Sequence, residues 1–308
     1  MIDSTELIEV VKQLELSLPD NYNSFSIDDK SHICKLLDDL LKVKRDLDQA
    51  KALNEPKLDC LRLELLRLSA QTKLITNLEI ISSAKPAASK LSTENTLYQG
   101  LDNIDRQLEH YLNYDNGYYI ELGANNGLSQ SNTAYFEKER GWKGVLIEPI
   151  LHNFLECKKN RSESNYFCNA ACVPFNYPQE TVKLLYSNLM TSQESEFSTL
   201  SNVQEHAQRG KRFLQSHEEV VPYFALARTL TDILEDAKAP RDIDFLSLDV
   251  EGVELEVLKG LDFNKHTIKY MLIESEDVET LSEYLATHGY KKIDRLSYHD
   301  HLFQLDTD

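Results

Sequence analysis

The sequence predicts an α/β protein in which a mainly parallel sheet follows an α-helical N-terminal element. From residue 118 onwards, short runs of β-branched and aromatic residues alternate with helical stretches at the spacing that parallel βαβ units require. Residues 1–82 contain no glycine, and their Leu, Ile and Val residues recur at helical spacing. The chain has 308 residues, of which 41% are hydrophobic, so it can bury the core of one large domain beside a smaller element.

The N-terminal segment 1–82 is predicted to form two helices that are separated at Pro56 and packed as an antiparallel hairpin or a coiled coil. Structural packing or homo-oligomerisation is the role expected of it. Residues 83–94 are rich in Ser, Ala, Lys and Pro, which is typical of a linker. The α/β domain is therefore expected over residues 95–308.

The α/β domain is predicted to contain seven strands, the last two forming a closing hairpin, at residues 118–122, 144–148, 166–172, 243–249, 268–274, 290–295 and 301–305. Helices are expected near residues 95–112, 129–139, 150–160, 231–237, 253–259 and 278–288. The regular alternation fails between residues 173 and 228, where Ser187–Arg212 is rich in Ser, Asn, Gln and Glu. A long polar insertion of this kind indicates either a lid or substrate loop, or a disordered surface loop.

The charge of the chain restricts its partners. A formal net charge of −18 argues against nucleic acid or an anionic membrane as main partner, because both would be repelled at long range. A neutral or cationic ligand fits this charge better. Five cysteines without a Cys-x-x-Cys pair are typical of reduced thiols. The N-terminus resembles no signal peptide and no stretch approaches ~20 apolar residues, so we expect a cytoplasmic protein that does not span a membrane.

A glycine turn follows the first predicted strand. Gly123 and Gly127 allow a sharp turn and close approach to a ligand, and polar residues then precede a helix whose N-terminal N–H groups are unpaired. The Gly-x-x-x-Gly spacing differs from the dinucleotide and phosphate-loop fingerprints. Glu148 ends the next strand, where an acid can accept both ribose hydroxyls. Alone, the turn could be an ordinary strand-to-helix connection and Glu148 a solvated acid. Together they indicate an adenosine site, which fits S-adenosylmethionine.

Several strings carry a family resemblance. They are Tyr-Ile-Glu-Leu-Gly-Ala-Asn-Asn-Gly (119–127), Ile-Glu-Pro (147–149), Asn-Ala-Ala (169–171), Thr-Leu-Thr-Asp-Ile-Leu (229–234) and Asp-Phe-Leu-Ser-Leu-Asp-Val-Glu-Gly-Val-Glu-Leu-Glu-Val-Leu-Lys-Gly (244–260). The chain resembles the FkbM-type methyltransferases from about residue 95 to 305. This resemblance implies a Rossmann-like seven-stranded methyltransferase sheet. It also implies an S-adenosylmethionine-dependent O-methyltransferase, often of sugar or polyketide hydroxyls.

Ligands of open α/β sheets bind at the carboxyl ends of the strands. The residues there that we expect to bind the cofactor are Glu121, Gly123, Ala124, Asn125, Gly127, Ser129, Glu148, Pro149, Asn169, Ala170 and Asp249. Within this set, Glu121 is expected to hold the methionine ammonium, directly or through water. Glu148 is expected to bind the ribose, and Asn169 with Ala170 to border the adenine.

Methyl transfer to a hydroxyl requires alignment of donor and acceptor and removal of the acceptor proton. Asp249, Glu251 and Glu274 are the expected catalytic residues, and His299 and His301 the secondary candidates, for substrate binding. Asp249 and Glu251 could instead cap the following helix. These carboxylates could also ligate Mg²⁺, although no diagnostic ligand string is present and no metal is expected.

The function expected from the sequence is O-methylation of a sugar or glycan hydroxyl. The alternatives are O-methylation of a small-molecule natural product and a non-catalytic scaffold of the same fold. An oxidoreductase on a Rossmann-like sheet is disfavoured by the glycine spacing.

Overall fold

The computed structural model describes residues 97–193, 198–200, 202–214 and 220–306. Its main element is a seven-stranded sheet with the order β10-β11-β9-β8-β1-β2-β3. The strands are β1 (Tyr118–Leu122), β2 (Lys143–Ile147), β3 (Tyr166–Cys168), β8 (Asp242–Leu248), β9 (Thr267–Glu274), β10 (Tyr290–Arg295) and β11 (Asp300–Leu305). The neighbours among β1, β2, β3, β8 and β9 pair in parallel, whereas β11 is antiparallel to both β9 and β10. The strand order reverses between β1 and β8, which creates a topological switch point.

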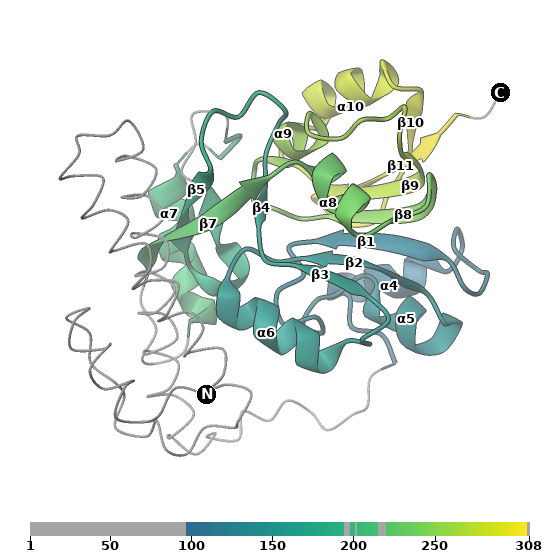
Figure 1. Cartoon of the computed structure of the whole chain (residues 1–308), viewed down its shortest axis with the longest axis horizontal. Coiled ribbons are helices and arrows are strands. Elements are labelled where there is room, and N and C mark those ends of the chain that lie inside the picture. Colours follow the sequence, from purple (N-terminus) through teal and green to yellow (C-terminus); the bar gives the residue numbers. More distant parts are fainter. Residues whose placement is uncertain (1–96, 194–197, 201, 215–219, 307–308) are drawn as a thin grey trace.

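Helices cover both faces of this sheet (Figure 1). They are α4 (Ile104–Leu108), α5 (Ala134–Arg140), α6 (Leu151–Asn160), α8 (Leu230–Asp236), α9 (Glu254–Leu258) and α10 (Val278–Ala286), and a 3₁₀ turn η2 (Leu101–Asn103) precedes α4. The alternation of side chains along β1 sends Ile120 into a core with α8, α9 and α10, and Tyr119 into a second core with α4 and α5. The result is a three-layer α/β/α domain, and the seven predicted strands are all present in it.

Several predicted boundaries differ from the structure. The helix predicted near 95–112 is shorter and consists of η2 and α4, over residues 101–108. Two other differences have a polar cause. The strand predicted at 166–172 leaves the large sheet after Cys168, because the Asn169 side chain donates to the carbonyls of Glu148 (2.8 Å) and Pro149 (2.9 Å). The helix predicted from residue 129 begins at Ala134, since the Asn126 side chain first closes a turn by accepting from the amide of Ser129. In both cases a polar side chain bonds to the backbone in place of regular structure.

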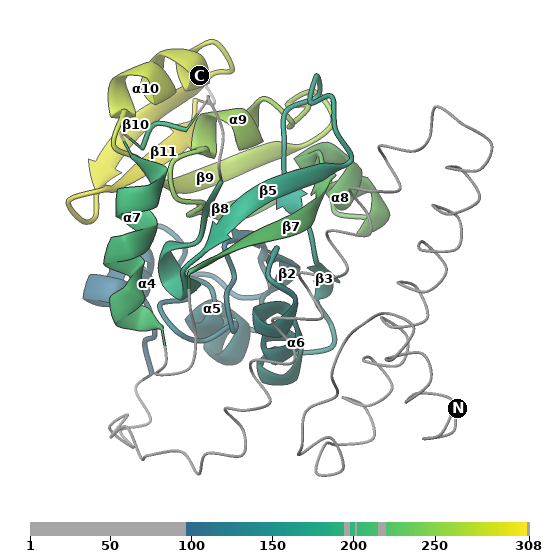
Figure 2. The ribbon, with the colours of Figure 1, turned by 90° about the vertical axis from the view of Figure 1, so that its left-hand side faces the viewer.

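The insertion before α8 forms a second sheet together with β4, contrary to the expectation of irregular chain. Its strand order is β4-β7-β5-β6, and it is accompanied by α7 (Figure 2). The elements are β4 (Ala171–Cys172), β5 (Thr181–Tyr186), η3 (Asn188–Met190), β6 (Ser192–Gln193), α7 (Val203–Gly210), η4 (Lys211–Phe213) and β7 (Val221–Arg228). Val182, Leu184 and Tyr186 of β5 pack with Tyr223 and Ala225 of β7. These partners are about 40 residues apart in the chain, which is why local periodicity did not reveal the pairing.

The predicted N-terminal helices (1–82) and the linker (83–94) lie outside the described residues. Within the part of the chain that the structure describes, no helix combines the length and apolar character needed to cross a membrane.

Candidate active site

A cavity of about 470 Å³ opens at the carboxyl ends of β1, β2, β8 and β9. The second sheet, α7 and the turn between β10 and β11 complete its wall. The sequence-predicted residues that line it are Glu121, Gly123, Ala124, Asn125, Ser129, Glu148, Pro149, Ala170, Asp249, Glu251, Glu274 and His299. Gly127, Asn169 and His301 are absent from this lining. The cavity therefore brings together residues from distant parts of the chain, as expected at a switch point.

The glycine turn after β1 is built by close backbone packing. Gly123 has φ +76°, and a Cβ atom there would lie 2.0 Å from the carbonyl oxygen of Asp249. Gly127 has φ +80°, and a Cβ atom would lie 2.8 Å from the Arg161 side chain. The amides of Gly123 and Ala124 both donate to the Ile147 carbonyl at 3.1 Å. Only glycine fits at 123 and 127, because both the positive φ and the contacts exclude a side chain.

Glu148 is the buried acid beside this turn, with 5% of its surface exposed. Its two carboxylate oxygens accept from the amides of Asn125 and Ile150, each at 2.8 Å. Burial raises the pKa of Glu148 to about 7, although these hydrogen bonds act in the opposite direction. The group therefore titrates near neutral pH at the place where a ribose was predicted.

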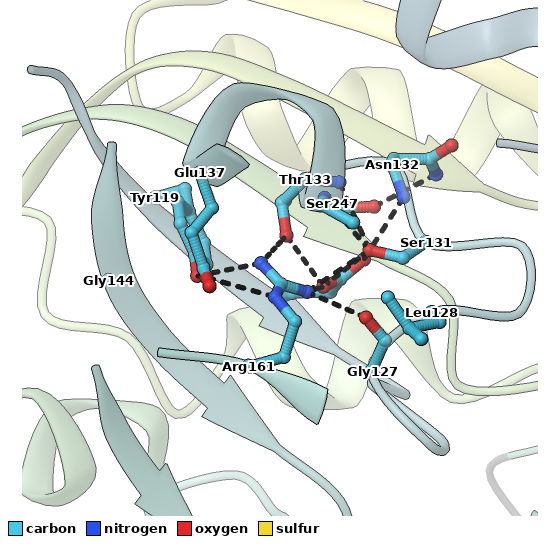
Figure 3. A network of polar contacts seen from close by, with 12 residues as sticks. Tyr119, Gly127, Leu128, Ser131, Asn132, Thr133, Glu137, Gly144, Arg161 and Ser247 are labelled. Atoms are coloured by element: carbon cyan, nitrogen blue, oxygen red, sulfur yellow. Dashed lines mark hydrogen bonds and ion pairs between the residues drawn. The ribbon is translucent and has the colours of Figure 1, made fainter. Parts of the chain in front are cut away.

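The carboxylate of Glu121 is surrounded by protein donors, although the sequence predicted that it contacts the cofactor. Its carboxylate accepts from the hydroxyls of Ser131 (2.8 Å) and Thr133 (2.6 Å) and forms an ion pair with Arg161 (3.1 Å). Figure 3 shows the side chains of Ser131 and Thr133 close to the guanidinium of Arg161, which donates to both hydroxyls. Protein donors thus already engage the carboxylate that was expected to meet the methionine ammonium.

Arg161, which directly follows α6, is a residue that sequence reasoning missed. It is 5% exposed, and its guanidinium also donates to Glu137 (2.9 Å), the Tyr119 hydroxyl (2.7 Å) and the Gly127 carbonyl (3.1 Å). In the sequence it follows two lysines and an asparagine, which is typical of a solvated helix end. Only the fold shows that it joins β1, the glycine turn and α5.

The acids after β8 and β9 lie together in the cavity wall. Burial, reinforced by the charge of Glu274, raises the pKa of Asp249 well above its ordinary value, so the two carboxyl groups can share a proton. Burial also raises the pKa of Glu274 and of Glu251. Neither Asp249 nor Glu251 caps α9, which begins at Glu254 without a side-chain cap, so the capping alternative is wrong. Glu254 accepts from the Gly252 amide (2.9 Å), and burial raises its pKa to about 7.

His206 of α7 reaches this acid cluster from the insertion. Its Nε2 atom lies 2.8 Å from Oε2 of Glu251, and the residue is 7% exposed. Glu251 itself has φ +58°, an uncommon conformation for a residue with a side chain. Sequence reasoning missed His206 because nothing in the polar segment around it signals a contact with the loop after β8.

The two histidines predicted near the last strand have different positions. His299 lines the cavity in the turn before β11. His301 lies within β11, opposite Ile273 of β9, and is 5% exposed. Burial lowers the pKa of His301, which is consistent with a neutral side chain in the sheet. Among the described His, Cys, Asp and Glu side chains, no group of three or more could hold a metal ion.

Comparison with known proteins places the chain in a family. The model of the methyltransferase FkbM domain matches residues 121–304. The chain belongs to this family of methyltransferases. A comparison with curated proteins finds no match.

The chain also has distant similarity to solved structures. "Human methyltransferase 10 domain containing protein" is 13% identical, with a TM-score of 0.32, 65% of this chain covered and 79% of that chain. "delta-N METTL16 MTase domain" is 14% identical, with a TM-score of 0.33 and coverages of 65% and 78%. "Crystal Structure of the N-terminal domain of human METTL16 in complex with SAH" is 12% identical, with a TM-score of 0.32 and coverages of 79% and 82%. These similarities are too distant to support a statement about function.

Proposed function

We propose that the protein uses S-adenosylmethionine to methylate a hydroxyl group, with a sugar or glycan as the leading acceptor class. The observation that carries this proposal is the cavity. The glycine turn and Glu148 line one side of it. His206 and the acids after β8 and β9 line the other. Residues expected to bind the cofactor and a group that can take a proton thus line one cavity in a member of a methyltransferase family.

The residues around the turn fit the adenosine half of this cofactor. Gly123 and Ala124 line the cavity beside the buried carboxylate of Glu148, which is positioned to accept ribose hydroxyls. Asn169 orients the chain between Glu148 and Ala170, which lines the cavity where the adenine would lie. Glu121 supports the turn through Arg161. When bound, S-adenosylmethionine supplies an electrophilic methyl group on its sulfonium.

His206 and Glu251 are the groups best suited to take the acceptor proton. The raised pKa of Asp249 beside the charge of Glu274 favours a shared proton in that pair, which makes the pair a poor base near neutral pH. His206 is an imidazole held by a carboxylate, an arrangement that orients a general base. We therefore assign proton removal to His206 and its orientation to Glu251. Asp249 and Glu274 are assigned to holding the acceptor hydroxyl.

The cofactor assignment is tested by calorimetry with S-adenosylmethionine and with NAD. The wild-type protein should bind the first and not the second. Glu148→Ala should lose contacts worth about 1.5–3 kcal/mol. Binding of NAD alone, or unchanged affinity in the variant, contradicts the cofactor assignment.

The catalytic assignment is tested with labelled cofactor and pools of oligosaccharides, nucleotide sugars, polyketides and peptides. His206→Gln and Glu251→Gln should lower kcat by roughly 10²–10⁴-fold with little change in cofactor affinity. His110→Gln is the matched control, because His110 is exposed and does not line the cavity. Normal turnover in both site variants would assign the base to another residue. Label in the polyketide pool alone would favour a natural-product hydroxyl as the acceptor.

The polar side chains that the insertion places in the cavity favour a hydroxyl-rich acceptor. Asn188, Thr191 and Gln193 line the wall next to α7 and supply amide and hydroxyl groups. These groups suit the hydroxyls of a sugar better than a flat apolar ring.

A further inference from the structure

Two arginines stand out in the wall of the cavity. Among the described residues that line it, Arg209 of α7 and Arg212 of η4 are the only lysine or arginine residues. Both are exposed, so they lie where the cavity meets solvent. Neither forms an ion pair with another described residue, although the Arg212 guanidinium lies 4.6 Å from the centre of the Phe213 ring.

Most acids of the cavity wall, by contrast, are engaged within the protein. Glu121 is paired with Arg161, and Glu251 with His206. Glu148 accepts hydrogen bonds from two backbone amides, and Asp249 interacts with Glu274 in a pair that can share a proton. The charged groups that remain available to a ligand on the α7 side are therefore the two guanidinium groups.

An exposed aromatic ring belongs to the same cavity. Tyr298, in the turn between β10 and β11, is 77% exposed and lines the cavity. The Arg295 guanidinium lies 4.8 Å from its ring centre and also donates to its carbonyl oxygen at 2.5 Å. These contacts hold the turn, while most of the ring surface stays open to a ligand. A large exposed ring at the edge of a cavity is suited to pack against the C–H face of a sugar ring.

We propose that the acceptor is an anionic sugar, whose carboxylate or phosphate binds Arg209 and Arg212 while its ring packs against Tyr298. This inference rests on the proposed methyl transfer and specifies its acceptor. Guanidinium groups bind carboxylate and phosphate through paired, charge-assisted hydrogen bonds. The overall charge of −18 does not oppose this, because at physiological salt charges more than about 8 Å away are largely screened. The charges nearest to the ligand therefore determine its binding, and on the α7 side of the cavity these charges are positive.

The test compares three acceptors that differ in a single group: a methyl hexoside, its 6-carboxylate and its 6-phosphate, in the gluco, galacto and manno series. Binding to the full-length protein, saturated with S-adenosylhomocysteine, is measured by calorimetry. At least one of the two anions should bind about tenfold or more tightly than its neutral counterpart, and that advantage should shrink as salt is added. The two anionic arms show whether the protein prefers carboxylate or phosphate.

The variants separate the arginines from general charge effects. Arg209→Gln combined with Arg212→Gln should remove the advantage of the anions and leave binding of S-adenosylmethionine unchanged. Lys211→Gln is the matched control, since Lys211 lies between them in the chain, is exposed and does not line the cavity. Tyr298→Ala should weaken binding of the charged and neutral sugars alike, whereas Tyr298→Phe should not.

Several results would overturn the inference: equal binding of neutral and anionic sugars, binding of none of them, or an advantage of the anions that survives the double substitution. Weaker S-adenosylmethionine binding in the double variant would assign the arginines to the cofactor carboxylate instead. Failure of the wild-type protein to bind S-adenosylmethionine at all would reject the proposed function itself, and the calorimetric titration with the cofactor alone detects this case.

Discussion

Replacing Arg161 should remove a large part of the stability of the domain. All three guanidinium nitrogens are engaged: Nε with Glu137 (2.9 Å), Nη1 with Glu121 (3.1 Å) and Nη2 with the hydroxyl of Tyr119 (2.7 Å). Arg161→Gln leaves two carboxylates without their counter-charge, one of them, Glu121, only 4% exposed. The substitution also removes the hydrogen bond to the Gly127 carbonyl.

The expected loss of stability follows from the burial of these charged groups. Breaking a buried ion pair by removing one partner costs about 3–5 kcal/mol, because the remaining charge stays desolvated. Domains have total stabilities of about 5–15 kcal/mol, so Arg161→Gln should lower the urea midpoint strongly or prevent folding. Arg161→Lys keeps a positive charge, but its single ammonium nitrogen cannot reach the partners that three separate guanidinium nitrogens contact. The loss of stability in this variant should therefore be intermediate.

The assay is urea unfolding followed by circular dichroism, with Arg228→Gln as the control. Arg228 pairs with Asp236 at 2.8 Å, but the two side chains are 28% and 57% exposed, so its loss should cost about 1 kcal/mol or less. If Arg161→Gln costs no more than Arg228→Gln, the guanidinium does not compensate the buried acids and this reasoning is refuted.

Three further predictions concern the acids and the glycine turn. Affinity for S-adenosylmethionine should rise about tenfold from pH 6 to pH 8, because Glu148 has a pKa of about 7 and accepts ribose hydroxyls as the carboxylate. In Glu148→Gln, calorimetry should show an affinity that does not change over this pH range. Glu254 has a pKa of about 7 in the folded protein against an ordinary 4.5, so the folded state holds its proton more tightly than the unfolded state. The free energy of unfolding should therefore fall by about 3 kcal/mol as pH rises from 4.5 to 7. Urea unfolding of Glu254→Gln should lack this part of the slope, and an unchanged slope would contradict the assignment. Gly123→Ala should destabilise the protein more than Gly289→Ala in the same assay. Both glycines have positive φ, worth about 1–2 kcal/mol, but the added Cβ would lie 2.0 Å from the Asp249 carbonyl oxygen at 123 and 3.8 Å from its nearest neighbour at 289. Equal losses would show that φ alone accounts for the requirement for glycine at 123.

The sequence by itself determined the features that depend on local pattern. Three local features predicted β1, its turn and one end of the cavity: the apolar run Tyr118–Leu122, the glycine turn and the acid at 148. Periodicity, turn chemistry and strand ends depend on neighbouring residues, so a short window of sequence is enough to recognise them. The same local strings carried the resemblance to the family that the match at residues 121–304 shows.

The tertiary structure alone decided which groups meet across the chain. Arg161 resembles a solvated helix end until the fold buries it against β1, and His206 lies in a polar segment until α7 brings it within 2.8 Å of Glu251. The pairing of β5 with β7 is likewise non-local. Burial, which raises the pKa values of Glu148 and Glu254 to about 7, also exists only after folding. Desolvation and long-range contact depend on the arrangement of the whole chain, so no window of neighbouring residues contains them.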